Sequence, residues 1–440
     1  MWKHDVIAGW GRVLKREGEF ARPERAAHLA RVMTELPGPA FGNRRSYGDA
    51  PLPAGEDGRG IDMTRMDKIL SFDAETGVLE AEAGLTLGEI TRIFAPRGWI
   101  PAVLPGTGFA TLGGAIAQDV HGKNHHGAGS FGQHVLAVTL LQPGGKRVVA
   151  TPETAPGLFR ATMGGIGQTG VIEAAKIQMI PTPGETMRVT ETRIDGFDAF
   201  LDALDSSTAT YTVGWIDGTA KGEALGRGIL EEAELDAAPR KRRAKDRTVP
   251  FNAPHFALSA PIVRLFNAAY FRRVPKAGRS RIRSIEQALF PLDAIHEWNR
   301  LYGKRGFYQF QCVVPVDQAE VLRQMLVEIS ESGACSPLAV IKRMGPGRAG
   351  PLSFPMEGYT LAIDFPARAA ARELIQLLEV MTQNAGGRLY LAKDALAGSE
   401  MIKAMYPEWE IWAKEAAKAD PEGRLVTDMV ARLKLREMGA

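Results

Sequence analysis

The chain has 440 residues, with 54 basic and 51 acidic side chains and a formal net charge of +3. Hydrophobic residues make up 45% of it and charged residues 24%, which is typical of a folded globular protein and excludes a largely disordered chain. The nearly balanced charge gives no general attraction to nucleic acid, so we expect no nucleic-acid partner. No apolar run approaches the roughly 18 residues of a membrane-spanning helix, and we expect any membrane contact to be peripheral.

The first part of the chain alternates short strands, short helices and glycine-rich turns. Residues 79–83 alternate small or apolar side chains with glutamates, which predicts a half-buried strand. Residues 85–94 carry apolar side chains at helical spacing and predict a helix. A further brief helix begins at Leu158 and is followed by a strand that ends at Pro181. This alternation predicts an α+β domain.

Longer amphipathic segments begin after about Arg188 and predict a second domain. The expected helices cover residues 197–204, 319–331 and 368–385, and the expected strands cover residues 308–314 and 359–365. Cys312 and Cys335 are the only cysteines, and without a C-x-x-C motif they predict two reduced, partly buried thiols.

The strongest charge run, P-R-K-R-R-A-K-D-R at residues 239–247, precedes an apolar, aromatic-bearing stretch at residues 256–271. We expect a mobile surface loop near residues 238–272. Basic and apolar side chains together are typical of a peripheral membrane contact, whereas the alternative is a solvated loop without a partner.

The segment DVHGKNHHGAGSFGQHV at residues 119–135 crowds histidines and glycines together. Residues 127–132 match the spacing of a dinucleotide-binding fingerprint, but the residues before them do not read as a strand. A metal site at His121, His125 and His126 is disfavoured, because glycines interrupt the helix that would align the rings and Asp119 is the only carboxylate nearby. We expect no metal.

The stretch G-N-R-R-S-Y-G-D at residues 42–49 resembles the pyrophosphate loop of the vanillyl-alcohol-oxidase type flavoproteins. The resemblance runs from about Gly9 to about Leu435, and it is strongest to the branch of this family that acts on lipid-linked ribose. The further matching motifs, in order, are L-P-G-T at 104–107, G-G-A-I-A at 113–117, the segment 119–132, F-P-L-D at 290–293, E-W-N-R at 297–300, P-L-S-F-P at 351–355 and K-D at 393–394.

This resemblance implies a two-domain α+β fold of the vanillyl-alcohol-oxidase (PCMH) type that binds FAD. It places an FAD-binding domain at residues 1–184, a substrate domain built on an antiparallel sheet at residues 185–387, and a segment that returns to the FAD domain at residues 388–440.

The glycines then have a physical reason, because a flavin diphosphate must lie against backbone N–H groups that only turns without bulky side chains bring close. Relatives with covalent flavin carry a histidine where this chain has Arg45, and no cysteine lies near the second loop, so we expect FAD to bind noncovalently. The residues implied to contact FAD are Asn43, Arg44, Arg45, Ser46, Tyr47, Gly48, Gly106, Thr111, Leu112, Gly113, Gly114, Gln118, Asp119, His121, Ile172 and Tyr390.

Lys393 is the first candidate for the chemistry, by resemblance to the family lysine beside flavin and substrate. Burial could lower its pKa so that it accepts the hydroxyl proton, or its charge could stabilise anionic reduced flavin. His121 and Lys123 are further catalytic candidates. Gln309 and Gln311, two residues apart on a predicted strand, point to one face and would bind sugar hydroxyls. Trp215, Arg300, Lys342 and Lys123 are expected along the substrate channel.

The resemblance implies oxidation of the 2′-hydroxyl of a polyprenylphosphoryl ribose to a keto sugar, the first half of an epimerisation to the arabinose form that serves cell-envelope polysaccharide synthesis. A separate NAD(P)-dependent short-chain reductase would act on the keto product, and we expect a cytoplasmic enzyme peripherally associated with the inner membrane. A soluble sugar, alditol or aldonolactone oxidase of the same fold is the alternative. Leu289, Thr360 and Ala362 depart from the mycobacterial members and bear on the substrate.

Overall fold

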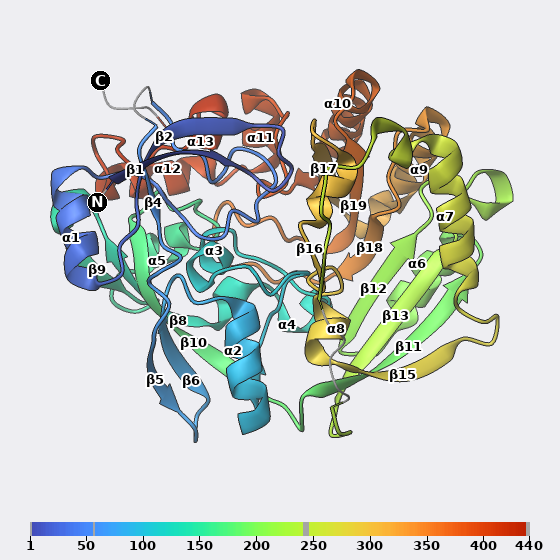
Figure 1. The fold of residues 1–440 in the computed structure, drawn as a ribbon, viewed down its shortest axis with the longest axis horizontal. Helices are drawn as coiled ribbons and strands as arrows, with labels where there is room; N and C mark the ends of the chain where they lie inside the picture. The colour runs from blue at the N-terminus through green and yellow to red at the C-terminus, as the bar shows by residue number, and fades with distance from the viewer. Residues whose placement is uncertain (1, 56–57, 241–245, 437–440) are drawn as a thin grey trace.

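The structure is a computed structural model that describes residues 2–55, 58–240 and 246–436 (Figure 1). Its strands form sheets of four, six, eight and two strands, with helices packed against them, which confirms the predicted α+β class. The four- and six-stranded sheets belong to the first half of the chain and the eight-stranded sheet to the second half. They lie on opposite sides of the molecule in Figure 1.

The described residues of the first half form the four-stranded sheet, the six-stranded sheet and helices α1 to α5. The four-stranded sheet has the order β1 (Trp2–Ala8), β2 (Lys15–Ala21), β4 (Gly60–Asp62) and β3 (Ala40–Phe41). The six-stranded sheet has the order β5 (Ile69–Asp73), β6 (Val78–Glu82), β10 (Val171–Pro181), β8 (Val135–Leu141) and β9 (Arg147–Ala150), and β7 (Trp99–Pro101) also pairs with β10. The helices are α1 (Ala26–Glu35), α2 (Leu87–Phe94), α3 (Leu112–Ala117), α4 (His125–Ala128) and α5 (Pro156–Thr162).

Helix α2 illustrates how closely local sequence determines this half. Thr86 caps it in a capping box with Glu89, and the apolar residues Leu87, Ile90 and Phe94 are buried on one face. A short 3-10 turn follows, and it ends at Gly98 with a left-handed φ of 83°. The predicted strand at residues 79–83 is β6, one residue earlier than expected.

The eight-stranded sheet of the second half is antiparallel throughout. Its order is β15 (Arg279–Ser284), β11 (Thr186–Ile194), β13 (Gly228–Asp236), β12 (Tyr211–Ile216), β18 (Ala339–Met344), β19 (Gly358–Pro366), β17 (Phe307–Val314) and β20 (Arg388–Leu389). The short strands β14 (Arg247–Thr248) and β16 (Ile295–His296) form a separate parallel pair.

Helices cover the two faces of this sheet differently. On one face, α6 (Phe197–Ser206), α9 (Ala319–Ser332) and α10 (Ala369–Asn384) share the largest apolar core with the strands. On the other face, α7 (Ala260–Arg272) packs through Phe271 on Ile229 of β13, and α8 (Ile285–Leu289) follows β15. Cys312 and Cys335 are free, as predicted, and they are buried more completely than expected, in the largest core.

The prediction of a mobile loop near residues 238–272 is wrong for the last part of this range. Residues 241–245 lie outside the described residues, but residues 260–272 form helix α7. Its pattern is helical because Val263, Asn267 and Phe271, four residues apart, are buried, and a proline in the first turn is compatible with a helix start.

The last segment contains α11 (Ser399–Met405), α12 (Trp409–Ala419) and α13 (Asp428–Arg432). It returns to the first half, because α12 packs on α5 and Asp428 of α13 is paired with Arg16 of β2. Residues 388–389 add strand β20 to the eight-stranded sheet, so the segment contacts both halves. We propose residues 1–184, 185–387 and 388–440 as the functional division of the chain. Within the described ranges, no helix is long and apolar enough to cross a bilayer.

Candidate active site

A cavity of about 460 Å³ lies between the two halves. Loops of the first half line one side of it, and residues of β12, β17, β18 and β19 line the other. On β17 and β18 the lining residues alternate, because successive side chains of a strand point to opposite faces. Among the predicted residues, the cavity is lined by Asn43, Arg44, Arg45, Ser46, Tyr47, Gly106, Thr111, Gly113, Gly114, Gln118, His121, Lys123, Ile172, Trp215, Gln309, Gln311, Lys342, Tyr390 and Lys393.

The loop side of the cavity fits a flavin nucleotide. An added Cβ at Gly106 would meet no protein atom within 4 Å, so a side chain there would occupy the cavity itself. The guanidinium of Arg45 lies 3.9 Å from the ring of Trp10 and 4.5 Å from that of Phe109, and its buried Nε has no protein partner. A bare backbone beside a fixed cation with a free donor suits a diphosphate.

Gly48, Leu112 and Asp119 do not line the cavity. A Cβ at Gly48 would lie 1.8 Å from the carbonyl oxygen of Asp394, so this glycine allows two backbones to meet. Leu112 is fully buried in the core. The Asp119 carboxylate accepts hydrogen bonds from the backbone N–H of Gly132 at 2.7 Å and of Ala349 at 3.1 Å, which gives it a structural role instead.

Arg300 also lies away from the cavity, which corrects its expected place in the substrate channel. Its guanidinium donates to the carbonyl of Val249 at 3.1 Å and is paired with Glu297 at 3.5 Å. The arginine therefore holds the segment before α7, a contact between distant residues that no local pattern indicated.

Most of the clustered histidines form hydrogen bonds with backbone groups, which hold the 121–134 segment in place. The ring of His125 contacts the carbonyl of Gly347 at 2.8 Å and accepts the N–H of Gly345, while the ring of His126 contacts the carbonyl of Ala209 at 2.9 Å. Among the described residues, no group of histidine, cysteine and acidic side chains is arranged to hold a metal ion.

His121 alone among them lines the cavity. Burial, reinforced by nearby Lys342, lowers its pKa well below the ordinary value, so the ring is neutral. Its Nε2 accepts the amide N–H of Gln311 at 3.2 Å, and the buried Nδ1 has no protein partner. In this arrangement Nδ1 carries the ring proton and makes no hydrogen bond with the described residues.

Lys393 lies in the wall of the cavity, with its Nζ 3.7 Å from the centre of the Tyr47 ring. The backbone N–H of Tyr47 donates to the carbonyl of Ala392 at 2.8 Å, which ties the 43–48 loop to the lysine segment. Burial lowers the pKa of Lys393, and Asp364 opposes this shift. A buried lysine with a lowered pKa has a neutral fraction near pH 7 that can accept a proton.

Asp364 is the main residue that the sequence reasoning missed. It is fully buried on β19, and it accepts hydrogen bonds from the amide of Gln309 and, at 3.0 Å, from the hydroxyl of Tyr302. Burial raises the pKa of Asp364, while nearby Lys393 counteracts this shift. A single carboxylate inside the otherwise uncharged strand Y-T-L-A-I-D-F was a usable signal, because buried charges are rarely without a partner.

The glutamine pair does share one face of β17, as its spacing predicts. Gln311 contacts His121, and Gln309 contacts Asp364, so both amides are held in place at the cavity wall. The structure thus fixes their orientation before any ligand binds.

Two further lysines, Lys123 and Lys342, line the cavity. Lys123 donates to the carbonyl of Ala288 at 2.8 Å and lies 3.5 Å from Glu231, a cavity residue that the sequence reasoning did not identify. Burial, reinforced by Lys123, lowers the pKa of Lys342 to about 8. Within the described chain, Lys342 has no hydrogen bond or ion pair. The indole N–H of Trp215 donates to the carbonyl of Pro337 at 2.9 Å.

Comparison with known proteins identifies the fold and the chemistry. Residues 20–151 match the family described as FAD binding domain. Decaprenylphosphoryl-β-D-ribose oxidase of Mycolicibacterium smegmatis is 36% identical over 98% of this chain and 97% of its own length. The chain belongs to the decaprenylphosphoryl-ribose oxidase family. It is therefore an FAD-dependent oxidoreductase with the two-domain PCMH-type α+β fold.

Other relatives differ in how much of the family architecture they share. An uncharacterized protein of Streptomyces coelicolor is 32% identical over 80% of this chain and all of its own length. D-arabinono-1,4-lactone oxidase of Yarrowia lipolytica is 25% identical over only 28% of this chain. The match to the decaprenylphosphoryl-ribose oxidase family extends through the substrate half, which supports this family over the aldonolactone alternative.

Proposed function

We propose that this protein oxidises the 2′-hydroxyl of a polyprenylphosphoryl ribose to the 2-keto sugar, with noncovalently bound FAD. The observation that carries the proposal is one cavity that joins the nucleotide-fitting loops to Lys393, to the fixed glutamine pair and to the unpaired Lys342. Oxidation of a sugar phosphate requires a group that accepts the hydroxyl proton, amides that bind the other hydroxyls and a cation that binds the phosphate. The family relationship points to the same substrate class.

The protein's own groups would divide the work as follows. FAD, when bound by the loops around Arg45 and Gly106, supplies the hydride acceptor. Gln309 and Gln311 would orient the ribose hydroxyls, since neighbouring Asp364 and His121 already fix the amides. The neutral amine of Lys393 would accept the hydroxyl proton as the carbon–hydrogen bond breaks, and the Nδ1–H of His121 would donate to a substrate oxygen.

The phosphate of the substrate is assigned to the part of the cavity lined by Lys342 and Lys123. Lys342 has no carboxylate to neutralise it among the described residues, so an anionic ligand would stabilise its charged form. Lys123 has Glu231 close by and contributes a weaker net charge. This part therefore favours a sugar phosphate over a neutral pentose.

The keto product is a substrate for reduction at the same carbon. We assign that second half of the epimerisation to a separate NAD(P)-dependent short-chain reductase, as the family resemblance implies. Cell-envelope polysaccharide synthesis is the process that would use the arabinose form.

The substrate is tested with a panel of short-chain prenylphosphoryl pentoses, free pentoses, alditols and aldonolactones. Under anaerobic conditions, the flavin of the wild-type protein should bleach with prenylphosphoryl ribose and stay oxidised with the neutral sugars. Bleaching by an aldonolactone or alditol, without bleaching by the prenylphosphoryl ribose, would instead establish the alternative function.

We expect denaturation to release all of the FAD from the protein chain, because no covalent bond holds it. The cavity lining contains Arg45 at the position that carries the attaching histidine in covalent relatives, and it contains no cysteine. Acid precipitation followed by absorbance measurement should therefore find the flavin in the supernatant. Yellow colour or flavin mass that stays on the precipitated chain contradicts noncovalent binding.

We also propose peripheral membrane contact, mediated mainly by an apolar surface on α7. Ile262, Leu265 and Phe266 are exposed on one side of the helix, and Leu265 is 75% exposed. Phe266 stacks on Tyr270, which lines the cavity, so this surface continues to the site. Apolar side chains at the edge of a site for lipid-linked sugars suit a bilayer surface.

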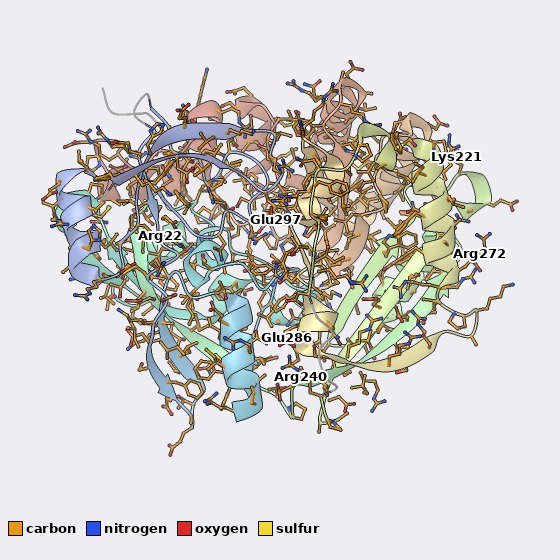
Figure 2. The ribbon with its side chains drawn as sticks, in the orientation of Figure 1. Arg22, Lys221, Arg240, Arg272, Glu286 and Glu297 are labelled. Atoms are coloured by element: carbon orange, nitrogen blue, oxygen red, sulfur yellow. The ribbon has the colours of Figure 1, made fainter. Side chains whose placement is uncertain are left out.

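The basic run contributes less than its charge predicts. Figure 2 shows Arg240 close to Glu286, and the guanidinium of Arg240 is paired with Glu286 at 3.1 Å and with Glu185 at 2.7 Å. Residues 241–245 lie outside the described residues. The charge of Arg240 is thus balanced within the protein, and the apolar helix face carries the membrane proposal.

Changing Leu265 and Phe266 to serine should reduce sedimentation with anionic liposomes by about tenfold or more, since each buried apolar side chain is worth about 1.5–3 kcal/mol. Val149→Ser on β9 is the matched control, because Val149 is a similarly exposed apolar residue, at 57%, that does not line the cavity. Equal sedimentation of the double variant, the control and the wild type would rule out this contact.

A further inference from the structure

A second cavity lies directly behind the catalytic wall. It measures about 20 Å³, which is enough for about one water molecule. Gln309, Gln311, Tyr390 and Lys393 line both this cavity and the large one, so they form the wall between them. Lys393 is the residue of this wall with a side chain that can take up and release a proton near neutral pH.

Glu379 of helix α10 lies on the opposite side of the small cavity. Its side chain is 5% exposed and makes no hydrogen bond or ion pair with the described residues. Burial, together with the negative charge of Asp394, raises the pKa of Glu379 to about 8, although Arg432 opposes the shift. A buried carboxyl without a protein partner, facing a water-sized space, is costly unless it has a use.

The reaction creates a need for such a group. Oxidation of the hydroxyl leaves one proton on Lys393, and the large cavity is then filled by cofactor and by a lipid-linked product. The charged lysine cannot accept the next proton until it releases the first. A path through the back of the wall would remove this proton without requiring the product to leave.

We propose that Glu379 and a water molecule in the small cavity carry this proton from Lys393 to solvent. The inference rests on the proposed function. The hydroxyl O–H bond breaks, and its proton binds Nζ of Lys393 while the hydride from carbon goes to FAD. Glu379, which is protonated at rest, first releases its proton at the surface of α10. The ammonium then gives a proton to the water, and the water gives one to the Glu379 carboxylate, which restores the protonated carboxyl. Lys393 is neutral again, and no further reactant is consumed.

The test compares Glu379→Gln with Glu373→Gln, which removes an exposed carboxylate of the same helix. With prenylphosphoryl ribose and a quinone dye as electron acceptor, steady-state turnover of Glu379→Gln in dilute buffer should fall by about tenfold or more. Turnover of Glu379→Ala should fall likewise, and formate, which can occupy the space left by the shortened side chain, should restore it. The first anaerobic reduction of flavin should stay at the wild-type rate, because the first turnover uses the fraction of Lys393 that is already neutral.

Infrared spectra of the oxidised protein without substrate give a second measurement. At pH 7, the band of a protonated carboxyl should be lost in Glu379→Gln and retained in Glu373→Gln. Wild-type turnover by Glu379→Gln in dilute buffer overturns the relay, as does a loss of turnover in Glu379→Ala that formate does not restore. A wild-type protein that leaves prenylphosphoryl ribose unchanged overturns the proposed function itself, and with it the source of the proton.

Discussion

Replacing Lys393 with methionine should lower the anaerobic rate of flavin reduction, per bound FAD, by about two decades or more, which is the usual size of a lost proton acceptor or electrostatic contribution. Methionine keeps most of the length of the side chain but removes the amine that lies over the Tyr47 ring. Stopped-flow absorbance with a prenylphosphoryl ribose measures the rate, and flavin content must be determined for each variant, because Lys393 lies in the cavity that would hold FAD.

The pH dependence distinguishes the two roles considered for Lys393. Burial lowers its pKa, so the neutral amine becomes available as pH rises through that lowered value, and the wild-type rate should rise with pH. Lys403→Met is the matched control, since Lys403 also lies over an aromatic ring, that of Trp409 at 4.7 Å, but outside the cavity. A near wild-type rate in flavin-replete Lys393→Met would remove Lys393 from the mechanism and leave His121 and Lys123 to be tested.

Replacing Arg432 with methionine should destabilise the protein by about 3–5 kcal/mol, because it leaves buried carboxylates without their partner. Arg432 of α13 pairs with Asp49 at 2.7 Å and with Asp394 at 2.8 Å. Asp49 follows the nucleotide-fitting loop, and Asp394 follows Lys393. The variant should therefore also release FAD more readily and reduce it more slowly. Urea denaturation and flavin release by ultrafiltration measure the two effects.

Arg436→Met separates general destabilisation from a local effect. Arg436 is almost fully buried and pairs with Asp420 at 3.1 Å in the same C-terminal segment, but it contacts neither loop. We expect a comparable loss of stability with a wild-type rate of flavin reduction per bound FAD. Equal flavin retention and reduction rates in the two variants would show that Arg432 does not position the site.

The sequence was most informative where local chemistry determines structure. The capping box before α2, the alternation in β6 and the two-residue spacing of Gln309 and Gln311 each require only neighbours along the chain. The glycine-rich loops and Lys393 were found by family resemblance, and both line the cavity. In these places the sequence alone, or with its family, located both fold and site.

Contacts between distant residues were not predictable in this way. Asp364 reaches Tyr302, 62 residues away, and Arg432 reaches Asp49, 383 residues away. Arg300 stood within a matching motif but holds a backbone segment outside the cavity. Which of these charged residues pair with one another depends on how the sheets and helices pack. The spacing of residues along the sequence does not predict this packing. Residues 260–272 form a helix instead of the expected loop, because Val263, Asn267 and Phe271 are buried at helical spacing although the neighbouring Ile262, Leu265 and Phe266 are exposed.

The most direct test of the proposed reaction is the deuterium isotope effect on flavin reduction, measured anaerobically with prenylphosphoryl ribose labelled at single carbons. Deuterium at carbon 2 of the ribose should slow the bleaching of FAD, deuterium at carbon 3 should not, and the product should carry a ketone at carbon 2. An isotope effect at another carbon, or flavin that stays oxidised with every labelled substrate, would contradict oxidation of the 2′-hydroxyl by this protein.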